Sequence, residues 1–189
     1  MKKVIILTTV ISLAFVSVSF CMWKTSADFN TYKEARKTAA DAEALGDTAT
    51  AVANYKKAAE LAGMFATEEI QAWQINNAAF ALIKKFKVLV AYDEKLTALA
   101  EMTPGKEKFA FQKEMTTLFA SKIELLNEAK ALLVSGETIN GGEAPMAKMQ
   151  SNVEFIDWVL KFIADNSSEA LQTQTPVVVP TVKAEEIIK

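Results

Sequence analysis

Apolar and small residues recur every three or four positions along most of this chain, which is the spacing of one face of an α-helix. The helical stretches cover residues 28–45, 48–62, 67–87, 88–102, 106–135 and 145–163. Short polar or Gly- and Pro-containing segments separate several of them. The pattern therefore predicts an all-α protein built of antiparallel helical hairpins, stacked either as a short solenoid or as a helical bundle.

The most informative stretch is residues 41–62, which reads as the end of one helix, a turn and a second helix. Gly46 can adopt the left-handed conformation that ends a helix, and Asp47 and Thr48 can accept N–H groups from the first turn of the next helix. Small and aromatic residues then form one stripe at spacings of four, three and four: Ala51, Tyr55, Ala58 and Ala62. Alanines on such a stripe allow a neighbouring helix to approach closely.

This hairpin resembles half of a tetratricopeptide repeat, whose second helix carries a turn Gly, then Ala, an aromatic residue and Ala. Those positions hold Gly46, Ala51, Tyr55 and Ala58. In the preceding helix the large anchors of the family are replaced by small residues, of which Ala39 is a fair substitute. The resemblance implies a helical-repeat protein that binds a protein or a peptide.

A second copy begins forty residues later, so that the partial match covers about residues 32–104. Phe86 stands in place of its turn Gly and Lys95 in place of its aromatic residue, so residues 67–103 form either one helix or two. The residues that the resemblance assigns to repeat packing are Ala39, Gly46, Ala51, Tyr55, Ala58, Ala79, Ala91 and Ala98. A helical bundle without repeats is the alternative.

Candidate partner-binding residues lie on the first helix of each copy. Arg36 and Asn77 match charged or amide positions that members of the resembled family use to bind a peptide's terminal carboxylate, although Ala40 replaces the Asn that they need. The full candidate set is Arg36, Asn76, Asn77 and Phe80. Alternatively, the two asparagines bond water or a neighbouring backbone.

The N-terminus has the arrangement of a secretory signal, because Lys2 and Lys3 precede an apolar run over residues 4–20. We predict a signal peptide or membrane anchor at 1–27, and we expect the cleaved, secreted product to be exported to the periplasm or the extracellular space. An uncleaved membrane anchor is the alternative, since the run reaches the lower limit for a span. Cys21 follows the bulky Phe20, which departs from the pattern of a lipidation site.

The rest of the chain divides into a helical domain at 28–171 and a tail at 172–189. Residues 106–135 read as one long helix, and the three glycines of residues 136–143 predict a flexible loop before the last helix. The tail contains two prolines around three valines, which favour an extended or disordered segment.

Composition excludes several chemistries. The chain has no His and one Cys, so we predict neither a Ser-His triad nor a His- or Cys-based metal site. Its formal net charge is −2 with no concentrated basic patch, so no nucleic-acid partner is expected. A hydrolase that uses carboxylates alone stays open as an alternative.

We expect no catalytic residue, cofactor or metal, and we interpret the chain as an exported, non-catalytic helical-repeat scaffold that mediates protein–protein or peptide binding. A membrane-anchored structural or envelope-assembly component is the alternative.

Overall fold

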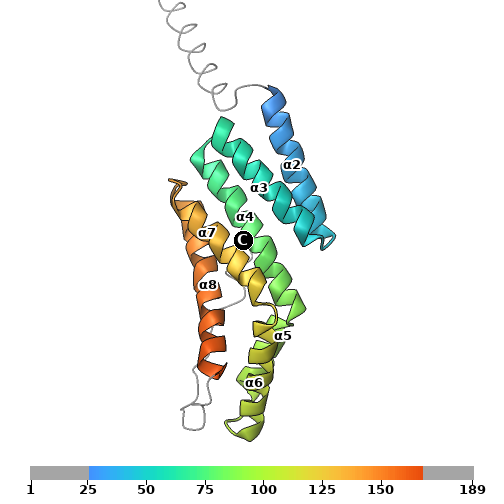
Figure 1. The fold of residues 1–189 in the computed structure, drawn as a ribbon, viewed down its shortest axis with the longest axis vertical. Helices are drawn as coiled ribbons and strands as arrows, with labels where there is room; N and C mark the ends of the chain where they lie inside the picture. The colour runs from blue at the N-terminus through green and yellow to red at the C-terminus, as the bar shows by residue number, and fades with distance from the viewer. Residues whose placement is uncertain (1–25, 168–189) are drawn as a thin grey trace, which may run out of the picture. The chain divides into compact units, whose positions relative to one another are not determined.

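The computed structural model describes residues 26–167, apart from the side chains of Ser26 and Phe65 (Figure 1). All the regular secondary structure in this range is α-helical, so the predicted all-α class is confirmed for the described residues. The helices are α2 (Ser26–Ala44), α3 (Thr48–Phe65), α4 (Glu68–Leu89), α5 (Tyr92–Glu101), α6 (Lys106–Ala120), α7 (Ile123–Glu137) and α8 (Glu143–Ser167).

Several predicted features fall outside the described residues. These are the signal or anchor segment up to residue 25, Cys21 within it, and the tail at 172–189. Ser26 and Ala27, the last residues assigned to that segment, begin α2. Within residues 26–167, none of the helices combines the length and hydropathy that a membrane crossing requires.

The described part of the predicted 28–171 domain divides into two compact units. The first unit contains residues 26–85 and 124–156, and the second contains residues 86–123 and 157–167. Helices α4 and α8 each contribute residues to both units. The chain therefore leaves the first unit within α4, builds α5 and α6, and returns to the first unit at α7.

In the first unit, α2 and α3 form the antiparallel hairpin that the sequence predicts (Figure 1). Gly46 has a φ of 76°, in the left-handed region, and the Asp47 carboxylate caps α3 by accepting the Thr50 N–H at 3.1 Å. Ala51 and Ala58 on α3 are fully buried. Their small side chains let the two helices approach closely, as the stripe on this helix indicates.

Helix α4 lies beside α2 and runs parallel to it. Gln74 of α4 donates a hydrogen bond to the Tyr32 hydroxyl at 3.2 Å, and Lys84 pairs with Glu43 at 3.1 Å. From the first link to the second, the residue number rises by eleven on α2 and by ten on α4. Because the residue numbers of both helices rise together along their contact, α2 and α4 run in the same direction.

Helices α7 and α8 complete the first unit as a second antiparallel hairpin. Gly136 in the last turn of α7 packs so closely that an added Cβ would lie 2.7 Å from Met149 Cε on α8 and 3.1 Å from Ile75 Cγ2 on α4. Gly141 lies even closer to Ala72, where an added Cβ would be 2.4 Å from the alanine Cβ. The predicted flexible loop at 136–143 is therefore shorter than expected, because Gly136 is buried inside a helix.

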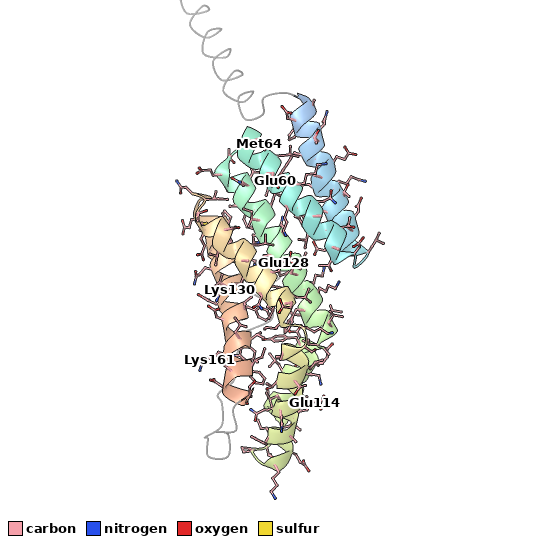
Figure 2. All side chains as sticks on the ribbon, in the orientation of Figure 1. Glu60, Met64, Glu114, Glu128, Lys130 and Lys161 are labelled. Atoms are coloured by element: carbon pink, nitrogen blue, oxygen red, sulfur yellow. The ribbon has the colours of Figure 1, made fainter. Side chains whose placement is uncertain are left out.

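The helices of the first unit alternate in direction along the chain. Helix α8 runs in the same direction as α4. Gly141, just before α8, packs against Ala72 near the start of α4, and Asn152 of α8 bonds Asn76 further along α4. Helix α7 therefore runs opposite to α4. Lys56 of α3 pairs with Glu128 of α7 at 3.0 Å, and Figure 2 labels Glu128 on α7. This ion pair is half exposed, so it contributes at most about 1 kcal/mol.

In the second unit, the core is aromatic. Phe86, Tyr92, Phe119, Trp158 and Phe162 form a continuous set of ring contacts with centroids 5.5–6.5 Å apart. Helices α5 and α6 pack together in this unit, and Lys95 pairs with Glu114 at 2.9 Å. Burial of the Tyr92 ring, together with the Asp93 charge, raises the pKa of the Tyr92 hydroxyl.

Residues 67–103 form two helices, which answers a question that the sequence leaves open. Helix α4 ends at Leu89 and α5 begins at Tyr92, and Ala91 between them has a φ of 47°. The prediction that Ala91 and Ala98 pack between repeats is wrong, because both are exposed. Ala91 lies in the turn itself, and Ala98 lies on the solvent side of α5.

The prediction of one long helix over 106–135 is also wrong. Helix α6 ends at Ala120 and α7 begins at Ile123. At the turn the Ser121 hydroxyl donates to the Leu118 carbonyl at 2.7 Å, and the Lys122 N–H donates to the Phe119 carbonyl at 3.1 Å. These short-range bonds form beside the helical bond from the Ser121 N–H to the Thr117 carbonyl, and no Gly or Pro marks the place in the sequence.

Candidate partner-binding face of helices α2 and α4

Three of the four candidate partner-binding residues lie along one edge of the α2–α4 pair. The contacts Tyr32–Gln74 and Glu43–Lys84 fix the parallel register of α2 and α4. In this register Arg36 of α2 lies level with Asn77 of α4. Asn77, Phe80 and Lys84 follow one another at spacings of three and four, which places them on one stripe of α4. Arg36 is exposed, and Asn77 and Phe80 are half-buried.

Asn76 does not belong to this face. Its side chain is 3% exposed, and its Oδ1 accepts a hydrogen bond from Asn152 Nδ2 of α8 at 2.8 Å. The assignment of Asn76 to partner binding is therefore wrong. Adjacent residues on a helix point about 100° apart, so Asn76 faces α8 inside the first unit while Asn77 does not share its direction.

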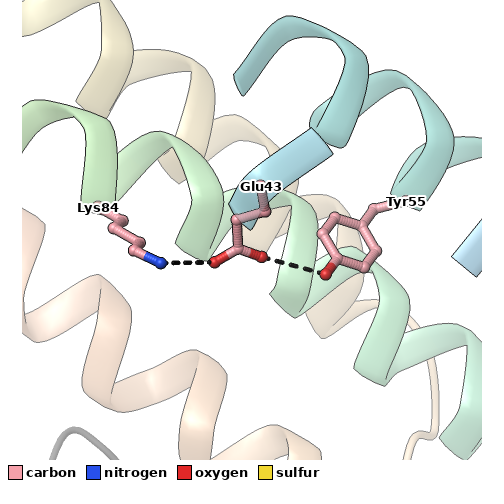
Figure 3. Close-up of polar contacts among 3 residues, drawn as sticks. All are labelled: Glu43, Tyr55 and Lys84. Atoms are coloured by element: carbon pink, nitrogen blue, oxygen red, sulfur yellow. Dashed lines mark hydrogen bonds and ion pairs between the residues drawn. The ribbon is translucent and has the colours of Figure 1, made fainter. Parts of the chain in front are cut away.

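Glu43 links all three helices at one end of the candidate face (Figure 3). Its carboxylate accepts a hydrogen bond from the Tyr55 hydroxyl of α3 at 3.1 Å and pairs with Lys84 of α4 at 3.1 Å. Burial, and then the charge and hydrogen bond of Glu43, raise the pKa of Tyr55 to about 12. The neutral phenol is thus the form that the folded protein stabilises, and it holds Glu43 in place.

At the other end of the face, Tyr32 and Gln74 form a buried polar pair. Tyr32 is 5% exposed and Gln74 is 3% exposed. The Tyr32 ring packs against Ala35, Ala58 and Ala62 and lies 5.8 Å below the Arg36 guanidinium. The contact over the ring helps to fix the Arg36 side chain at the surface of α2.

Sequence reasoning missed four residues that hold these helices together: Glu43, Gln74, Lys84 and Asn152. A signal for two of them exists, because Gln74 and Asn152 interrupt apolar stripes. Gln74 lies four residues after Ile70 and four before Ala78, and Asn152 lies between Met149 and Ile156. A polar residue at a core position needs a buried partner, but its identity depends on which helix packs there.

The residues that the repeat resemblance assigns to packing lie in different settings. Ala39, Ala51, Ala58 and Ala79 are each 0% exposed, and Tyr55 is 7% exposed. Gly46 lies at the surface in the turn between α2 and α3. All the buried members of the set belong to the first unit, whereas Ala91 and Ala98, which are exposed, belong to the second.

The candidate face combines polar and aromatic side chains. It presents a guanidinium, an amide and an aromatic ring, next to a carboxylate that already has two partners. Among residues 26–167, no group of three or more His, Cys, Asp or Glu side chains is placed to hold a metal ion. Asp47, whose pKa is lowered by its hydrogen bonds with Thr50, serves as a helix cap.

Comparisons with protein-family models, with curated proteins and with solved structures found no match to this chain.

Proposed function

We propose that this protein is an exported, non-catalytic helical-repeat scaffold that binds a protein or a peptide along the edge formed by α2 and α4. The observation that carries this proposal is the shared edge of Arg36, Asn77 and Phe80 on two parallel helices. Groups from two helices can contact one extended partner simultaneously. Exposed or half-buried Arg and Phe side chains are also typical of binding hot spots.

The packing of the first unit supports a tetratricopeptide-like array in this proposal. In such an array, the first helices of successive repeats lie side by side and each is followed by an antiparallel second helix. Helices α2, α3 and α4 have this relation. Facing residues on α2 and α4 differ by 42 and 41 positions, close to the forty-residue period of the sequence pattern.

The proposal assigns the second repeat differently from the sequence pattern. We pair α4 with α7 rather than with α5, so that residues 86–123 of the second unit intervene between the two helices of one hairpin. Helix α7 has its own buried stripe at spacings of three, four and three: Leu126, Ala129, Leu133 and Gly136. The first half of α8 would then begin a third repeat.

Binding assays of edge variants test the proposed face. Full-length protein is used to recover partners from the exported fraction, comparing wild type with Arg36→Ala, Asn77→Ala and Phe80→Ala. We expect at least one variant to lower recovery of the same partner about tenfold, which corresponds to about 1.4 kcal/mol.

Glu60→Ala is the matched control, because Glu60 is an exposed residue of α3, a helix that contributes no residue to this edge (Figure 2). It should leave recovery unchanged. Equal recovery by wild type and all three edge variants contradicts the placement of the binding face, provided that their circular dichroism spectra agree.

A membrane-anchored structural or envelope-assembly component is the second candidate. The observation that favours it is the apolar run at residues 4–20 behind Lys2 and Lys3. Under this candidate the segment stays attached, and the membrane becomes a partner of the chain. Intact-mass measurement decides between the two: a product that retains Met1 in the membrane fraction supports the anchor, and a soluble product shortened near residue 27 supports export.

A further inference from the structure

Gln74 carries a buried polar atom that its surroundings do not satisfy. The side chain is 3% exposed, and its Nε2 donates to the Tyr32 hydroxyl at 3.2 Å. Its Oε1 has no hydrogen-bond partner among the described residues of the chain. A buried carbonyl oxygen that has lost its water is unfavourable unless a donor reaches it.

Turning the amide over does not remove the difficulty. If the oxygen and nitrogen exchanged places, Oε1 could accept the Tyr32 O–H, but Nε2 would then take the position without a partner. The backbone offers no donor either, because Gln74 lies inside α4, where neighbouring N–H groups bond within the helix. The Gln74–Tyr32 pair therefore needs one more hydrogen-bonding group.

The surroundings of the pair restrict what that group can be. On its apolar side, Tyr32 packs against small or aliphatic side chains without donors: Ala35, Ala58, Ala62, Leu61, Ala66 and Ile70. Such walls favour a small, uncharged donor over an ion or a large polar ligand. Water meets this description, and buried waters in proteins commonly bond otherwise unsatisfied polar groups.

We propose that Gln74 Oε1 binds one structural water between α2 and α4 of the first unit. The water donates one hydrogen to Oε1 and uses its remaining hydrogen-bonding capacity on a second polar group of the same interface, such as a helix carbonyl oxygen. It extends the single Gln74–Tyr32 bond into a small polar network. This network holds α2 and α4 in register at the end opposite to the Glu43–Lys84 pair.

A high-resolution crystal structure of the full chain tests this site directly. We expect density for one ordered water within hydrogen-bonding distance of the Gln74 amide oxygen. The proposal is overturned if the amide has no such density, or if Oε1 bonds a protein group directly. In solution, water-to-amide magnetisation transfer to the Gln74 side-chain N–H₂ protons provides the same test, and its absence counts against the site.

The variant Gln74→Met sharpens the assignment, because it keeps the side-chain length and removes both polar atoms. We expect the water to be missing from the Gln74→Met crystal structure. If the same water remains, other groups hold it and the role given to Gln74 is wrong. Gln150→Met is the control, since Gln150 is exposed on α8 and bonds Glu154; it should keep the water. If Gln74→Met does not fold, the wild-type density and magnetisation transfer still decide the question.

Discussion

The two units of this protein bury their interiors in different ways. The first unit packs many of its helix contacts through alanines and glycines that are almost completely buried, among them Ala39, Ala58 and Gly136, and fills the rest of its interior with aliphatic side chains such as Leu126 and Ile156. The second unit packs through five aromatic rings. An alanine interface buries little apolar area per residue but brings backbones close, whereas an aromatic core gains its stability from large side chains.

The difference also decides where polar groups are needed. Alanine stripes fit together in more than one register, because their surfaces have few distinctive shapes. The first unit carries specific polar links that select one register: Tyr32–Gln74, Glu43–Lys84 and Asn76–Asn152. In the second unit the rings themselves have distinctive shapes, and edge-to-face contacts such as Phe86–Phe119 restrict how they pack.

Removing an aromatic ring should have the largest effect on stability. Phe119 is fully buried and contacts Phe86, Tyr92 and Phe162. Phe119→Ala should lower the free energy of unfolding by about 3–5 kcal/mol, because it loses the burial of the ring and leaves a cavity. Urea unfolding measures the change. Phe109→Ala, at an exposed position of the same helix, is the control; equal losses for the two would refute the aromatic core.

Enlarging an alanine tests the opposite property of the first unit. Ala58 is fully buried against α2, where it belongs to the cluster around Tyr32. Ala58→Leu should lower the free energy of unfolding by about 3 kcal/mol, since the added carbons force the helices apart. Ala53→Leu, on the exposed side of α3, should change it little. If thermal unfolding places both variants within a degree or two of wild type, close packing of α2 and α3 is not what stabilises this unit.

Breaking a buried amide pair should cost less. Asn152→Ala removes the donor to Asn76 Oδ1 and leaves that oxygen without it inside the first unit. The expected loss of unfolding free energy is about 2 kcal/mol. Chemical denaturation provides the measurement, with Asn127→Ala on the exposed side of α7 as the control. A loss no greater than that of the control would mean that the pair does not contribute to register.

The smallest effect should be a dependence of stability on pH through Tyr55. Its pKa is raised from 10.0 to about 12 in the folded protein, so the unfolded chain releases the phenolic proton first. Folding stability from this group is fully present below pH 10 and is lost as pH rises toward 12. Tyr55→Phe should therefore weaken the decline of stability across this window.

Stability measured by denaturant titration at several pH values from 9 to about 12 tests this prediction. The decline should not vanish in Tyr55→Phe, because Tyr92 in the second unit also has a raised pKa. Identical pH profiles for wild type and Tyr55→Phe would contradict a raised pKa of Tyr55 in the folded protein. Tyr55→Phe should also lower stability by about 1 kcal/mol at neutral pH, through loss of the hydrogen bond to Glu43.

Local signals in the sequence predicted the elements that depend on neighbouring residues. Gly46 and Asp47 indicate the α2–α3 turn, and the Thr67 hydroxyl caps α4 by accepting the Ile70 N–H at 3.3 Å. The sequence left the turn at Val90–Ala91 open and gave no sign of the turn at Ser121, because neither contains Gly or Pro. Ala91 adopts a left-handed conformation that an alanine rarely takes, which tertiary packing must stabilise.

The sequence also predicted the candidate face only in part. Arg36, Asn77 and Phe80 could be named from the helical pattern and the repeat resemblance. Their shared edge could not, because it depends on the parallel register of two helices separated by about forty residues. Asn76 was assigned to the wrong surface for the same reason, since the helix that covers it lies 76 residues further along the chain.

The sequence by itself determined that this chain forms helices and where the first hairpin turns, because helix periodicity, capping and left-handed glycine act over a few residues. Only the tertiary structure decided that α4 packs with α7 and α8, which amides become buried, and which alanines remain in solvent. Those outcomes depend on contacts between segments far apart in the chain. Such contacts are selected by the fit of whole helix faces, which no short stretch of residues specifies.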